Sequence, residues 1–232
     1  MSLLKIISDS LEGGRLPDGF SLPREGGDDG GIAFADGAMD GIGLYHMGPQ
    51  EPEEDDRRLM EEAVLAAGSR DFRRADESFW ALSQKVRALS LAECLSSFVM
   101  DHKDEVNADA LYDYALTLIR DSDGRECVKY GLILLSLFKT DGDEAVKQAV
   151  QTLALSDEFT PFALFAMMEW TDGNEAIFDL AKKVRGWGRI HAVERLEPAT
   201  EEIRRWLLTE GVRNDVMPAY SALTCWQKSG AE

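Results

Sequence analysis

The sequence predicts an all-α protein built from short antiparallel helix pairs and preceded by a small glycine-rich segment. From residue 53 onward, apolar residues recur at helical spacing in runs of about 10 to 16 residues joined by short polar turns. Three of these turns share the form Asp-Gly-x-Glu, and eleven of the 20 glycines lie before residue 50. We therefore divide the chain into an N-terminal segment, residues 1–50, and a helical domain, residues 51–232.

The N-terminal segment combines a short helix, a loop and a candidate β-hairpin. The helix is indicated by one apolar face that contains Leu3, Leu4, Ile7 and Leu11. Two short apolar runs, 32–34 and 42–45, are separated by two Asp-Gly pairs, a dipeptide common in hairpin turns. We expect this segment to cover one end of the helical domain or to lie in its concave face.

The three Asp-Gly-x-Glu turns, which begin at Asp123, Asp141 and Asp172, each stand directly before an apolar run. An Asp at the cap accepts hydrogen bonds from free backbone N–H groups, and a Glu three residues later reaches back to the cap. Both carboxylates also face the positive end of the helix dipole. Each turn therefore predicts the start of a helix.

A longer self-similarity contains two of these turns. Residues 140–146 align with residues 171–177 at a spacing of 31, and looser matches lie 26 to 35 residues apart. The run 143–155 has one apolar face, whereas 125–138 and 159–169 are apolar almost all round and must be sandwiched. Two-helix units of this size are typical of an α-solenoid.

These repeats resemble HEAT or armadillo-type repeats, most closely at residues 188–196. The resemblance covers residues 105–227 and extends by extrapolation to 53–104. It implies a short curved solenoid, a fold that usually acts by binding and that serves many functions.

Three segments carry a second resemblance: residues 34–42, 45–47 and 186–196. These segments are similar to those of an uncharacterised bacterial family whose members are sometimes labelled limonene hydroxylase. The resemblance implies that label and brings no catalytic residues with it. A hydroxylase needs haem, flavin or non-haem iron, yet His46, His102 and His191 are the only histidines and no two are closely spaced. We therefore expect no cofactor and keep an enzyme of unknown reaction as the alternative.

The composition of the chain limits the classes of partner and the cellular compartment that we expect. A net charge of −18 argues against binding to nucleic acid or to a membrane surface, and no apolar run is long enough to span a bilayer. Three widely spaced cysteines in apolar helical patterns favour buried thiols in a reducing compartment, which we take to be the cytoplasm: Cys94, Cys127 and Cys225. Four aspartates of the N-terminal segment lack the spacing of a calcium-binding loop: Asp28, Asp29, Asp36 and Asp40. We expect them to stabilise turns and helix caps and not to bind a metal ion.

The charge is unevenly distributed along the chain. Residues 1–56 hold 13 acids and 3 bases, whereas residues 182–232 hold 7 acids and 9 bases. Basic and aromatic residues alternate in this last part, a composition favoured at contact sites. The candidate partner-binding residues are Arg185, Trp187, Arg189, His191, Arg195, Arg204 and Arg205.

Two interpretations of these seven residues stay open. In the first, they bind an unknown protein or an acidic peptide, of which the chain's own N-terminal segment is one candidate. In the second, they are structural: Arg204 and Arg205 pair with neighbouring glutamates, and Trp187 fills a junction between repeats. The predicted function is non-catalytic protein or peptide binding.

Overall fold

The computed structural model describes residues 1–24, 34–48 and 51–230, and within these ranges it is helical with no β-strand. The all-α prediction is thus confirmed for the described residues. The described part of the chain holds thirteen α-helices and two π-helical turns in the order α1 (Leu3–Asp9), α2 (Ala38–Ile42), η1 (Gly43–Met47), α3 (Glu54–Gly68), α4 (Phe72–Ser83), α5 (Ala88–Asp101), α6 (Ala108–Asp121), α7 (Arg125–Leu135), α8 (Glu144–Ala154), α9 (Thr160–Met168), α10 (Gly173–Ala181), α11 (Trp187–Arg195), α12 (Glu201–Trp206), η2 (Leu207–Gly211) and α13 (Ala219–Ser229).

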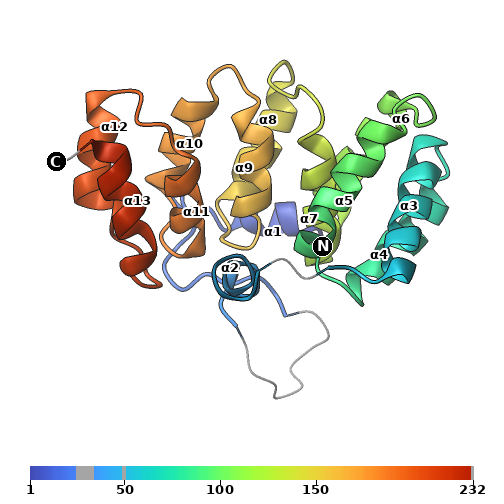
Figure 1. The fold of residues 1–232 in the computed structure, drawn as a ribbon, viewed down its shortest axis with the longest axis horizontal. Helices are drawn as coiled ribbons and strands as arrows, with labels where there is room; N and C mark the ends of the chain where they lie inside the picture. Colours follow the sequence, from blue (N-terminus) through green and yellow to red (C-terminus); the bar gives the residue numbers. More distant parts are fainter. Residues whose placement is uncertain (25–33, 49–50, 231–232) are drawn as a thin grey trace.

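Helices that are neighbours in sequence pack as pairs, and the pairs stand side by side in a row (Figure 1). The pairs include α3 with α4, α6 with α7, α8 with α9 and α10 with α11. A second set of contacts links α5, α7, α9, α11 and α13, each to the next. These five helices therefore form one continuous layer, and all of them begin at the same edge of it, which we call the N-terminal edge.

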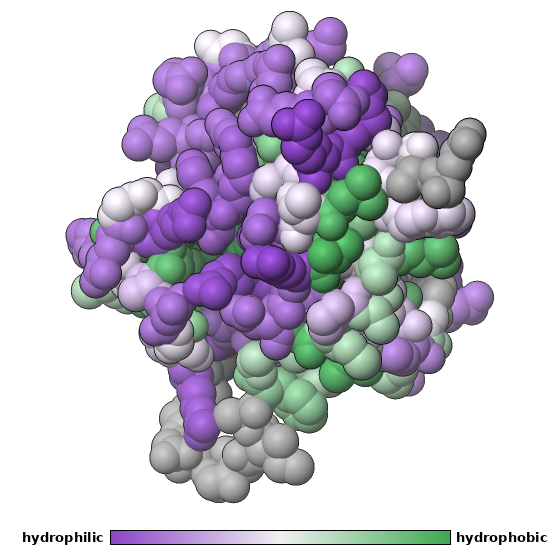
Figure 2. All heavy atoms as spheres, turned by 90° about the vertical axis from the view of Figure 1, so that its left-hand side faces the viewer, coloured by the Kyte–Doolittle hydropathy of each residue, from purple (hydrophilic) through white to green (hydrophobic). Residues whose placement is uncertain are grey.

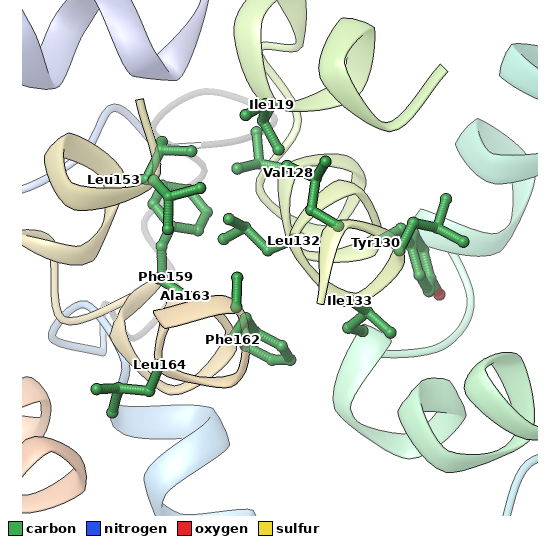
Figure 3. Close-up of a cluster of buried hydrophobic side chains, with 14 of the residues drawn as sticks. Ile119, Val128, Tyr130, Leu132, Ile133, Leu153, Phe159, Phe162, Ala163 and Leu164 are labelled. Atoms are coloured by element: carbon green, nitrogen blue, oxygen red, sulfur yellow. The ribbon is translucent and has the colours of Figure 1, made fainter. Parts of the chain in front are cut away.

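One hydrophobic core runs through the molecule from α1 to α13. Its centre lies between α7 and α9, where Leu132, Phe162 and Ala163 meet (Figure 3). Ten of the eleven residues of α7 are buried, so this helix is covered on every side. The apolar run that contains α7 was predicted to be sandwiched, and this prediction is confirmed.

The three Asp-Gly-x-Glu turns do precede helices, but their predicted capping hydrogen bonds are wrong. Gly124, not Asp123, is the N-cap of α7, and Asp143 caps α8 by accepting the N–H groups of Ala145 and Val146. Asp172 is the N-cap of α10, but its side chain accepts no capping hydrogen bond and pairs with Lys147 at 2.9 Å. Asp141 in turn accepts hydrogen bonds from Thr171, so the carboxylates of Asp141 and Asp172 pair with the neighbouring helix pair and do not cap their own helices.

The predicted β-hairpin is wrong where the structure describes it. The run 42–45 lies in α2 and η1, while Ile32 and Ala33 of the first run lie outside the described residues. Gly37, with a φ of 75°, is the N-cap of α2 and does not form a hairpin turn. Tertiary contacts of the segment with the helix row replace the strand pairing that the local sequence favours.

The described residues 34–48 run along the N-terminal edge. They do not cover an end of the helix row: Figure 1 shows α2 beside the middle of the row. The end that carries α12 and α13 is hydrophilic over its upper left part in Figure 2, with hydrophobic residues gathered toward the right and lower parts. Among the described residues, no helix is both long and apolar enough to cross a membrane.

Candidate functional site

Seven charged side chains hold residues 34–48 on the N-terminal edge. We call them the ion cluster: Asp36, Asp40, Arg87, Arg125, Glu126, Lys129 and Glu158. Two of them belong to the N-terminal segment. The other five stand at or near the starts of α5, α7 and α9, and we call these five the fixed part of the cluster. The cluster therefore joins the segment to three successive helices of one layer.

Lys129 lies at the centre of the ion cluster, and its side chain is 0% exposed. Its ammonium group contacts one oxygen from each of three carboxylates: Asp40 at 2.7 Å, Glu126 at 2.8 Å and Glu158 at 2.5 Å. A buried charge is tolerated only when it is paired and hydrogen-bonded, and Asp40 supplies one of these three partners from the N-terminal segment.

Two arginines extend the cluster. Arg87 Nε lies 2.8 Å from Asp40 Oδ1. Arg125 Nη1 lies 2.9 Å from Asp36 Oδ1, and Arg125 Nη2 donates to the carbonyl oxygens of Leu22 and Pro23 at 3.1 Å each. Each aspartate of the segment thus has its own arginine, and Arg125 also ties down the loop that leads into the segment.

The electrostatics of the cluster favour its charged forms. Burial alone would raise the pKa of Asp40 and of Glu158. Lys129 together with Arg87 at Asp40, and Lys129 together with the N–H of Gly37 at Glu158, outweigh burial, so both pKa values lie below normal. Burial would lower the pKa of Lys129, and its three carboxylates raise it instead. For Asp36, burial prevails and raises the pKa in spite of the ion pair with Arg125. Lys129 therefore stays protonated and acts as a fixed cation, not as a base or a nucleophile.

Two glycines let the segment approach the edge closely. A side chain at Gly37 would meet the carbonyl group of Asp157, and one at Gly41 would enter the ring of Trp187. The N–H of Gly37 donates to Glu158 Oε2 at 2.8 Å. Glycine is therefore required at both positions by contact with another part of the chain, and at Gly37 by its positive φ as well.

Beyond Asp40, the segment enters a group of rings from α11 and α13, which we call the aromatic slot: Trp187, His191 and Tyr220. Tyr45 stacks on Trp187 with ring centroids 6.0 Å apart and on His191 with centroids 5.8 Å apart. A ring nitrogen of His46 hydrogen-bonds the hydroxyl of Tyr220. Burial lowers the pKa of His191 to about 4, so this ring is neutral near pH 7.

The seven residues singled out from the sequence have different surroundings. Trp187 and His191 come together in the aromatic slot. Arg189 is buried and donates to the carbonyl oxygens of Val184 and Glu210, each at 2.9 Å. The other four are placed as follows: Arg185 pairs with Asp18, Arg195 lies over the ring of Phe165, Arg204 pairs with Glu201, and Arg205 is exposed on α12.

The three cations of the ion cluster are not among the candidate residues predicted from the sequence. Arg87 lies two residues after Lys85, Arg125 and Lys129 lie in an acidic or apolar stretch, and the three share no motif. One signal did exist: Lys129 is a lone charge between Val128 and Tyr130 in a run predicted to be buried on all sides. A lysine at such a position needs an acidic partner from elsewhere in the chain.

Next to the cluster lies an open hollow of about 420 Å³, whose lining includes Phe20, Ser156, Asp157, Lys183 and Arg185. Asp157 accepts the N–H of Gly188 at 3.0 Å, close to the start of α11. Burial raises the pKa of Asp157 to about 6. Among the described residues, no group of three or more His, Cys, Asp or Glu side chains is arranged to hold a metal ion.

Comparison of this chain with family models, with curated proteins and with solved structures found no match. Its function must therefore be argued from the site. The ion cluster and the aromatic slot together bind a polypeptide segment, and the cation at their centre is paired on all sides. This arrangement is suited to recognition of an acidic chain.

Proposed function

We propose that residues 51–232 form a short α-solenoid of the HEAT or armadillo type and that residues 1–50 are an attached N-terminal segment. Support comes from the row of helix pairs and from the continuous layer of α5, α7, α9, α11 and α13. Each pair contacts mainly its neighbours, as expected for repeats that bury a shared core.

We infer that the protein acts by non-catalytic binding of a protein or peptide partner. The observation that carries this proposal is the N-terminal edge itself, where side chains from five helix starts converge on one acidic segment. Such a surface offers charge pairing, backbone contact and an aromatic slot, which are the usual means of peptide recognition. Cys94 and Cys225 are free thiols, which fits the reducing cytoplasm.

A second candidate function, an enzyme of unknown reaction, has one observation in its favour. Asp157 borders a hollow, and burial raises its pKa to about 6, a property common among catalytic acids and bases. The hydroxylase label makes this candidate specific, because such a protein must carry haem, flavin or iron. If the purified protein shows neither the visible absorbance of haem or flavin nor bound iron, the hydroxylase hypothesis is excluded.

Selection from a random peptide library displayed on phage tests the binding proposal. We expect enriched peptides to slow amide hydrogen exchange at the starts of α5, α7, α9 and α11. Replacing Arg87 with Ala should weaken their capture. Replacing Arg73 with Ala, which breaks only an exposed ion pair with Glu77, should leave capture unchanged. If no sequence is enriched, or if protection falls elsewhere on the molecule, the proposal is wrong.

A further inference from the structure

We propose, on the basis of the binding function above, that the N-terminal edge recognises an acidic helical segment with two aspartates four residues apart, and that residues 34–48 are the chain's own displaceable occupant of this site. The features that such a partner must share with the occupant can be read from the contacts. They are an Asp-Gly pair, a second Asp-Gly pair four residues later, and a tyrosine five residues after the second Asp.

Charge supports an acidic ligand. The fixed part of the ion cluster holds three cations, Arg87, Arg125 and Lys129, against two carboxylates, Glu126 and Glu158. Without Asp36 and Asp40 it would keep a net charge of +1 (three minus two) beside several helix starts, which attract anions. Asp36 pairs with Arg125 at 2.9 Å, and Asp40 pairs with Arg87 at 2.8 Å, so the edge offers a separate cation to each of two acidic side chains.

Shape restricts which acidic segments fit. The Asp157 carbonyl and the Trp187 ring leave no room for a side chain at the positions of Gly37 and Gly41. By contrast, a side chain at Gly43 would make only an ordinary contact with Leu89, at 3.5 Å. The edge therefore selects small residues at two positions that each follow an aspartate, and it tolerates larger residues further along.

The occupant can leave without opening the main core. Its apolar contacts form a small separate cluster of Ala38, Trp187 and Ile190, with Ile42, Tyr45 and Tyr220 around it. The main core instead includes Leu3, Ile7 and Leu22, which anchor the chain before residue 34. Release of residues 34–48 would thus expose the ion cluster and the aromatic slot while the helix row keeps its own core.

An occupant in the same chain competes strongly with an external one, because tethering gives it an effective concentration in the millimolar range. We therefore expect the unmodified chain to bind a matching peptide weakly. Variants that loosen the internal segment should bind the peptide tightly, because the fixed part of the cluster and the slot are unchanged in them.

The test uses a fluorescent peptide with the sequence of residues 34–48 and measures its anisotropy with the full-length chain. Two variants loosen the internal segment, Gly41→Ala and the double change Asp36→Asn with Asp40→Asn. Gly43→Ala is the matched control. We expect both loosened variants to bind the peptide at least tenfold more tightly than the unmodified chain, and the control to match the unmodified chain. A peptide with both aspartates changed to Asn should bind at least tenfold more weakly.

Three results would overturn this inference. One is equal peptide binding by folded loosened variants and by the unmodified chain. Another is equal binding of the Asp and Asn peptides. The third is loss of helical circular dichroism in both loosened variants, because residues 34–48 would then be an integral part of the fold. Any of these results leaves the binding function standing if library-selected peptides of another sequence still bind at the edge.

Discussion

Lys129 shows why the N-terminal segment is held so specifically. Its ammonium group is fully buried, and one of its three carboxylate partners, Asp40, comes from the segment. Removing one partner from a buried ion pair typically costs about 3 to 5 kcal/mol, much more than breaking an exposed pair. The exposed pair of Lys5 with Asp9 therefore matters little, whereas the contact of Lys129 with Asp40 decides where residues 34–48 lie.

Asp157 is predicted to make stability depend on pH. Burial raises its pKa from 3.8 to about 6 in the folded protein. A group whose pKa is raised by folding stabilises the fold below its unfolded pKa, and this contribution is lost as the pH rises through its folded pKa. We expect Asp157→Asn to be more stable than the natural chain by about 1 to 2 kcal/mol at pH 7, with no gain near pH 4.

Urea unfolding of both proteins at several pH values between 4 and 7 checks this expectation. Only the difference between the two proteins is informative, because the lowered pKa values of Asp40 and Glu158 make both proteins less stable in acid. The difference should grow between pH 4 and 6 and then level off. A difference that stays constant across this range would show that Asp157 keeps an ordinary pKa.

At the scale of the helix, α7 is predicted to be intolerant of a single added methyl group. A Cβ at Gly131 would lie 2.8 Å from Leu118 Cβ and Ile119 Cγ2, and 3.1 Å from the carbonyl oxygen of Ala115. Alanine gains about 1 kcal/mol in helix propensity, whereas overpacking a tight contact costs about 1 to 3 kcal/mol. We expect Gly131→Ala to destabilise the protein by about 1 to 2 kcal/mol, because both contact atoms are close to the rigid backbone of α6.

Chemical denaturation of Gly131→Ala and of Gly142→Ala provides the comparison. A Cβ at Gly142 has no neighbour within 4 Å, so this control should change stability by less than about 0.5 kcal/mol. Equal stability of the two variants would mean that α6 and α7 move apart freely, which would contradict the tight packing of this helix pair.

The helices could be predicted from the sequence because their cause is local. The apolar spacing of α8 fixes both its helix and its buried face, and the all-round apolar run of α7 predicts a helix that is covered on every side. The segment around Gly37 and Gly41 was mistaken for a hairpin because Asp-Gly is also a turn signal. Neither glycine lies in a hairpin turn. Each is required because a side chain there would clash with a distant residue, with Asp157 at Gly37 and with Trp187 at Gly41. A glycine required by a distant contact cannot be distinguished from a turn glycine in a single sequence.

At the scale of the whole molecule, the candidate site depends on residues far apart in the chain. Asp40 meets Arg87 across 47 positions and Lys129 across 89. Local composition instead favours residues 185–205, where basic and aromatic residues are dense. Three of those residues do contact the N-terminal segment: Arg185 pairs with Asp18, and Trp187 and His191 stack on Tyr45. The pairing of distant charges is set by the helix row, so it could not be predicted from local composition.

The net charge of −18 leads to a last prediction about salt. Like charges spread over a compact molecule repel one another, and salt screens exposed charges much more than buried pairs such as Lys129 with Asp40. We expect the free energy of unfolding to rise by about 1 kcal/mol between about 0.02 and 0.2 M NaCl, with most of the gain below 0.1 M, where the screening length is about 10 Å. Urea unfolding at a series of salt concentrations measures it. A gain that grows steadily into the molar range would indicate stronger burial of apolar surface instead, and a loss of stability would show that exposed ion pairs outweigh the repulsion.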